Sequence, residues 1–148
     1  MKHLLIFLLL ATFSAPAFAQ FPLGGTMSKI KAYFDENVSY ASSQEFKTEN
    51  GNDVLCFTKV RVIGDYTFYF DNKGICTSYV VTYDKNELSE VEHRFDNKFC
   101  KLEATKWESE EGIYNVVLLP PGSGANYFSV IYQPLQSDSF RENTLASN

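Results

Sequence analysis

Runs in which aromatic and β-branched residues alternate with other residues recur along most of this chain. Aromatic residues make up 16% of the sequence, and many of them fall within these runs. Such side chains suit a pleated, half-buried surface, so each run predicts a β-strand. Five strands are expected on this basis: Val54–Val62, Tyr66–Phe70, Ile75–Tyr83, Tyr114–Leu119 and Tyr127–Tyr132.

Two other segments carry apolar residues at helical spacing. The first helix is expected to begin near Thr26 or Ser28, either of which can serve as N-cap, and to end near Asn37. The second is expected to span roughly Glu87–Phe99, with Leu88, Val91, Phe95 and Phe99 on one face. The segment between Val38 and Phe46 is weakly patterned.

The two halves of the chain align without gaps at an offset of 61 residues, which matches Phe34 with Phe95, Gly51 with Gly112 and Tyr66 with Tyr127. Both halves then contain a helix followed by strands. The sequence therefore predicts an α+β fold in which two helices pack on one face of an antiparallel sheet of about five or six strands. The expected arrangement is two imperfect α-β-β repeats, at about 26–84 and 86–133, within one domain over residues 20–135.

This element order resembles the tandem α-β-β modules of the β-lactamase-inhibitor-protein family and of the small SmpA/OmlA-type envelope proteins. The resemblance covers most of residues 26–132 and includes the helix start Gly25-Thr26-Met27-Ser28. The first half departs from it by adding the strand Ile75–Tyr83. The resemblance implies an exported protein that binds a partner without catalysis, although a fold does not by itself fix a function.

Residues 1–19 have the pattern of a secretory signal peptide. Lys2 and His3 precede a short apolar run, and Ala17-Phe18-Ala19 fits the small-x-small rule, so cleavage is expected between Ala19 and Gln20. The run is too short to span a bilayer as a helix, which predicts no membrane anchor after removal of the signal. The expected location is therefore periplasmic or extracellular. Residues 136–148 are polar and unpatterned, and we expect them to form a flexible C-terminal tail.

The charge of the chain argues against nucleic acid as a partner, and its cysteines limit the possible disulfides and metal sites. The 18 acidic residues outnumber the 13 basic ones, and the basic residues are scattered, which argues against nucleic acid as a partner. Cys56, Cys76 and Cys100 are an odd number, so at most one internal disulfide is expected, and a Cys56–Cys76 pair would join strands that are not neighbours. No cysteine has metal-ligand spacing to another cysteine or to histidine, so no metal is expected.

The sequence predicts no catalytic residue and no cofactor. His93 lies off the apolar stripe of the second helix, and Cys100 is too far along the axis to form a dyad with it. Glu108, Glu110 and Glu111 cluster in an expected turn, where solvated charge is the ordinary interpretation. The loop Gly122-Ser123-Gly124 precedes a strand rather than the helix that a phosphate-binding loop requires.

Tyrosines on the expected strands are the remaining candidates for function. Tyrosine combines a large apolar area with a polar tip, which suits interfaces, although tyrosines at sheet rims also simply cover the core. The candidate binding residues are Tyr66, Tyr69, Tyr79, Tyr83, Tyr127 and Tyr132. We expect the sheet face opposite the helices to bind another protein, so that the chain is an exported non-catalytic binding module and not an enzyme. The alternatives are a small secreted or periplasmic enzyme and an envelope structural or assembly factor.

Overall fold

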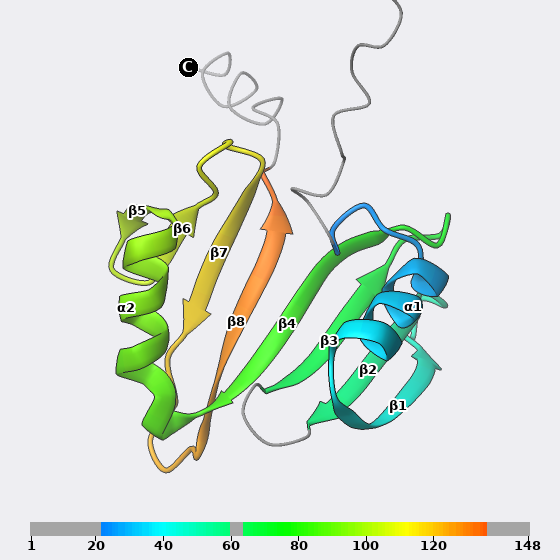
Figure 1. Ribbon diagram of the computed structural model, residues 1–148, viewed down its shortest axis with the longest axis horizontal. Helices are drawn as coiled ribbons and strands as arrows, with labels where there is room; N and C mark the ends of the chain where they lie inside the picture. The colour runs from blue at the N-terminus through cyan, green and yellow to red at the C-terminus, as the bar shows by residue number, and fades with distance from the viewer. Residues whose placement is uncertain (1–21, 60–63, 136–148) are drawn as a thin grey trace, which may run out of the picture.

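The computed structural model describes residues 22–59 and 64–135 (Figure 1). The expected signal peptide with its cleavage site, and the expected tail over residues 136–148, lie outside these ranges. Within them, neither helix has the length and apolar character needed to cross a membrane.

A single antiparallel sheet of eight strands forms most of the described structure, with the strand order β1-β2-β3-β4-β8-β7-β6-β5. Two α-helices, α1 (Met27–Asn37) and α2 (Leu88–Lys98), accompany it, and the short 3-10 helix η1 (Lys85–Glu87) leads into α2. The strands are β1 (Tyr40–Lys47), β2 (Asp53–Lys59), β3 (Asp65–Phe70), β4 (Cys76–Asp84), β5 (Cys100–Glu103), β6 (Lys106–Glu108), β7 (Tyr114–Leu119) and β8 (Tyr127–Pro134).

The expected α+β fold with five or six strands and two α-β-β repeats is therefore wrong. The sheet dominates, and each helix is followed by four strands rather than two. The sequence patterns missed β1, β5 and β6. The edge strands β1 and β5 are exposed along almost their whole length, so their side chains do not alternate between apolar and polar. Strand β6 has only three residues, too few to show a period.

The offset of 61 residues holds for the helices but fails in the strands. Helices α1 and α2 begin 61 residues apart, whereas Tyr66 lies in β3 and its match Tyr127 lies in β8. The second half is shorter, because β5 and β6 have four and three residues where β1 and β2 have eight and seven. By order after the helix, β8 corresponds to β4, and these two strands pair with each other at the centre of the sheet.

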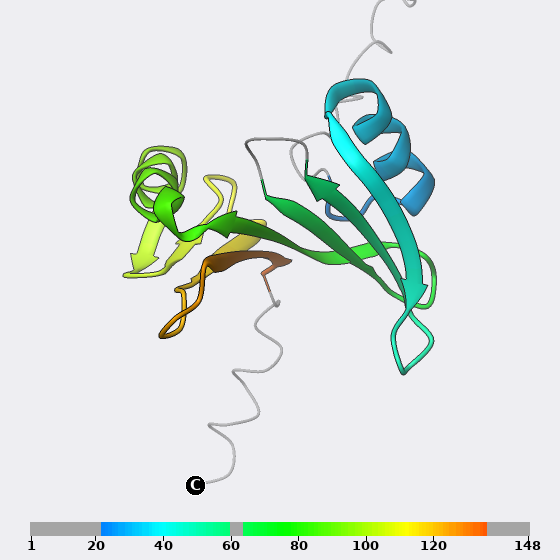
Figure 2. The same ribbon diagram turned by 90° about the horizontal axis from the view of Figure 1, so that it is seen from below.

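Both helices pack on the same face of the sheet (Figure 2). The register places Phe68, Tyr79 and Tyr132 directly opposite one another across β3, β4 and β8, so their side chains share one face. On that face Phe34 of α1 stacks on Phe57 with ring centroids 4.2 Å apart. Phe95 of α2 lies 5.4 Å from the ring of Trp107, which is fully buried. Each helix therefore covers its own apolar cluster, and the centre of the sheet lies between them.

A β-bulge in β4 changes which residues face the helices. Tyr69 pairs with Ser78, whereas Phe70 pairs with Cys76, so Thr77 is the extra residue. The bulge turns Cys76 onto the helix-covered face, where it is 2% exposed among the residues of the α1 cluster. Strict alternation along the strand would place Cys76 on the face opposite Tyr79. All three cysteines are free thiols, with Cys56 half-buried and Cys100 exposed.

Candidate functional site

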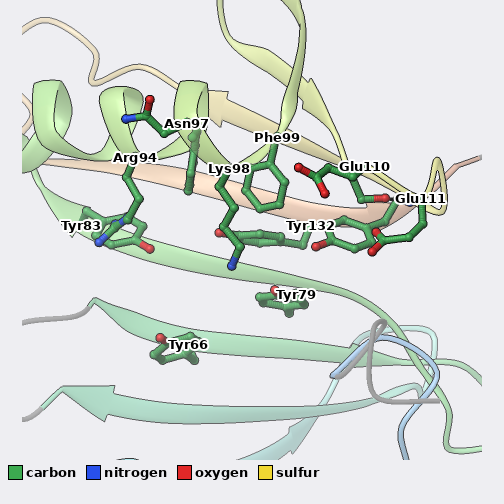
Figure 3. Close-up of a pocket in the computed structure, with 13 residues that line it drawn as sticks. Tyr66, Tyr79, Tyr83, Arg94, Asn97, Lys98, Phe99, Glu110, Glu111 and Tyr132 are labelled. Carbon is green, nitrogen blue, oxygen red and sulfur yellow. Dashed lines mark hydrogen bonds between the residues drawn. The ribbon is translucent and has the colours of Figure 1, made fainter. Parts of the chain in front are cut away.

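The centre of the helix-covered face contains an open groove of about 760 Å³ (Figure 3). Strands β3, β4, β7 and β8 supply its floor, α2 supplies one wall, and the turn between β6 and β7 closes one end. Five tyrosines line it: Tyr66, Tyr79, Tyr83, Tyr114 and Tyr132. We call this feature the tyrosine groove. Its volume is in the range of ordinary ligand sites.

The floor is built where β4 and β8 meet. Tyr79 and Tyr132 are directly opposite each other in this strand pair, and their rings stack 4.3 Å apart at an interplanar angle of 4°. Tyr83 stacks on Phe128 of the neighbouring strand, 5.3 Å away. These contacts fix the rings before any ligand arrives, which lowers the entropy lost on binding.

Burial raises the pKa values of the floor tyrosines, whose hydroxyls are protonated at neutral pH with or without this shift. It raises the pKa of Tyr66 to about 12. The pKa values of Tyr79 and Tyr132 are raised well above the usual range, again mainly by burial. Burial also raises the pKa of Tyr83, although the nearby Arg94 guanidinium opposes the shift. A neutral phenol is both a donor and an acceptor, so the floor offers hydroxyl groups that can donate to a ligand at neutral pH.

The wall that α2 forms carries two cations. Arg94 and Lys98 lie four residues apart, hence on the same side of the helix, and both side chains extend toward the sheet tyrosines (Figure 3). The Arg94 guanidinium lies 5.8 Å from the centre of the Tyr83 ring, and the Lys98 ammonium lies 5.4 Å from that of Phe99. Neither cation forms an ion pair with any residue that the structure describes.

The end of the groove near β7 is acidic. Glu110 and Glu111 line it from the turn between β6 and β7, next to Tyr114. Ser109 holds this turn: it is 2% exposed, and its hydroxyl accepts hydrogen bonds from the backbone N–H groups of Ile113 and Tyr114 at 3.0 and 3.3 Å. The groove therefore has basic groups along one wall and carboxylates at one end.

The structure brings four of the six candidate tyrosines together and separates the other two. Tyr66, Tyr79, Tyr83 and Tyr132 all line the groove, on the face that the helices cover rather than on the open face. Tyr69 pairs with Val54 and is 38% exposed on the opposite face, and Tyr127 is 61% exposed at the start of β8. The sequence did not predict Tyr114, Arg94 and Lys98 as site residues. The i, i+4 pair of cations beside Phe95 was visible, but only the strand order shows what it faces.

Other reactive groups lie apart from the groove or are engaged in structural contacts. His93 is exposed on α2, with Nε2 3.1 Å from the amide nitrogen of Asn97. Asp96 accepts hydrogen bonds from Lys101 at 2.9 Å and from Trp107 Nε1 at 2.8 Å, contacts that lower its pKa. No cluster of three metal-ligating side chains occurs in the described ranges.

Comparisons of this chain with protein-family models, curated proteins and solved structures give no match.

Proposed function

We propose that this protein is an exported, non-catalytic binding module that holds a segment of another protein in the tyrosine groove. The observation that carries the proposal is the convergence of five tyrosines from four strands on one open, pre-ordered groove. Tyrosine and arginine are the residue types that dominate binding energy at protein interfaces. The resemblance to exported partner-binding modules favours the same function.

The composition of the groove resembles that of an antibody combining site. Tyrosine supplies rigid contact area with few rotatable bonds, while serine and asparagine supply adaptable hydrogen bonds. Arg94 and Asn97 line the groove beside the tyrosines, whereas the Ser109 hydroxyl is engaged by the backbone of its own turn. Because the groove is open to solvent rather than enclosed, a chain segment can lie in it, which suits a polypeptide. Among the described residues of the opposite face, Tyr69 lies across Val54 from exposed Phe46, and Tyr127 lies apart from them at the start of β8.

Site-specific photo-crosslinking tests this proposal. The full chain would be produced in its source cells with p-benzoylphenylalanine in place of Phe99, which lines the groove. The matched control carries the same residue in place of Tyr127, which is more exposed but lies outside the groove. We expect the Phe99 variant to form one defined adduct with another protein. Peptide mass spectrometry of that adduct should identify a single contiguous segment of the partner at the crosslink.

Adducts that form at position 127 and not at position 99 would refute the groove as the binding site. Adducts that scatter over many proteins and many peptides at position 99 would refute specific binding.

A further inference from the structure

We infer that the segment bound in the tyrosine groove is bipolar, with an acidic side chain against Arg94 and Lys98 and a basic side chain against Glu110 and Glu111. This inference rests on the proposed function and adds the chemistry of the ligand.

What sets these two cations apart is their position on the groove wall, since Lys29, Lys73, Lys85 and Lys106 also form no ion pair with a described residue. Lys31, Lys47 and Lys101 each pair with a carboxylate, from Glu45, Asp53 and Asp96 respectively. Arg94 and Lys98 have no such partner in the described residues, although the chain as a whole carries an excess of acidic groups. Two cations that extend over a groove without a counter-ion form a site for an anion.

The floor beneath these cations supplies hydrogen-bond donors. The protonated hydroxyls of Tyr66, Tyr79 and Tyr83 can donate hydrogen bonds, and a carboxylate accepts several at once. The guanidinium of Arg94 adds two parallel donors that match a carboxylate. Its stacking on Tyr83 holds it near this position before binding. Floor and wall thus present donors to the same space.

The β7 end of the groove carries the opposite charge. A purely acidic segment would meet the Glu110 and Glu111 carboxylates beside Tyr114, where like charges repel. Neither carboxylate forms an ion pair with a described residue. A lysine or arginine in the segment would satisfy them, and would also fix the direction in which the segment lies along the groove.

Selection from a random dodecapeptide library displayed on phage tests the inference with the full-length protein. Enriched peptides would be synthesised and titrated by calorimetry against the wild type, R94Q, K98Q and R94K, with K29Q as the matched control. Lys29 is an exposed helical lysine outside the groove. Thermal melts of each variant would show that it is folded. Removing a hydrogen bond between a charged side chain and the peptide should lower the affinity at least about tenfold.

We expect the enriched peptides to share one acidic and one basic position. R94Q and K98Q should each weaken binding at least about tenfold, R94K by less than R94Q, and K29Q not at all. The double variant E110Q/E111Q should weaken binding only of peptides that retain the basic residue.

The other outcomes overturn different parts. One is a peptide that crosslinks to benzoylphenylalanine at position 99 yet binds R94Q and K98Q with the same affinity as wild type. That result would overturn the acidic side chain of the proposed segment and leave the proposed function intact. Unchanged affinity for E110Q/E111Q would overturn the basic half. Library peptides that fail to enrich, or that crosslink only at position 127, would overturn both the bipolar segment and the groove as the binding site.

Discussion

Gly64, which immediately precedes β3, occupies a position where any side chain would collide with the neighbouring strand. A Cβ atom at this residue would lie 1.1 Å from the carbonyl oxygen of Thr82 and 2.1 Å from its carbonyl carbon. The next residue, Asp65, pairs with Thr82 in the β3–β4 ladder. Since the obstacle is backbone, no side-chain rotation relieves it, and the strands must separate by about 2 Å to restore normal contact distances.

We therefore expect Gly64→Ala to lower the free energy of unfolding by at least about 3 kcal/mol, the upper part of the range for inserted methyl groups in packed sites. Such a separation would also displace Tyr66 and Tyr83, which follow on the same two strands and line the groove. Urea denaturation followed by the fluorescence of Trp107 measures the change. The matched control is Gly122→Ala, where a Cβ meets nothing within 4 Å.

The control should change stability by no more than about 0.5 kcal/mol. A loss below about 1 kcal/mol for Gly64→Ala would show that the two strands do not approach each other as closely as described here.

Four further predictions follow from burial and charge. Phe34→Ala and Phe95→Ala should each cost about 3–5 kcal/mol in denaturant melts, because both rings are almost fully buried; a loss under about 1 kcal/mol at either site would contradict that packing. Burial raises the pKa of Tyr66 from 10.0 to about 12. The stability that the protonated Tyr66 hydroxyl contributes is therefore complete below pH 10 and is lost as the pH rises toward 12. In alkaline melts, the free energy of unfolding should fall less with pH for Tyr66→Phe than for wild type. Iodoacetamide should label exposed Cys100 well before Cys76, whose pKa burial raises to about 12, and peptide mapping that finds Cys76 labelled first would refute this. We expect cleavage after Ala19, so the intact mass of the mature protein should correspond to a first residue Gln20, and a retained Met1 would contradict cleavage there.

Strongly periodic segments could be located from the sequence with small errors. The expected helix over Glu87–Phe99 is observed at Leu88–Lys98, and the strand Tyr114–Leu119 has the bounds expected. In these segments burial on one face imposes the period that the pattern reveals. Strand β1 lacks such a pattern because its side chains are exposed on both faces, so only pairing with β2 makes it a strand.

The candidate site could be predicted only in part, because it depends on pairing between distant segments. Aromatic strands pointed to Tyr79 and Tyr132, but no local pattern shows that β4 lies beside β8. That pairing determines which strands and which tyrosines lie opposite Arg94 and Lys98. The bulge at Thr77 was equally hidden, because a single extra residue leaves the composition of a strand unchanged.

The pairing of β4 with β8 means that the groove is a composite of two parts of the chain. Tyr66, Tyr79 and Tyr83 come from the part before α2, whereas Tyr114 and Tyr132 come from the part after it. Neither fragment alone would contain the stacked Tyr79–Tyr132 pair. If the chain were divided between Asp84 and Lys85, ligand affinity would report fragment complementation, since the groove would re-form only where the exposed edges of β4 and β8 join.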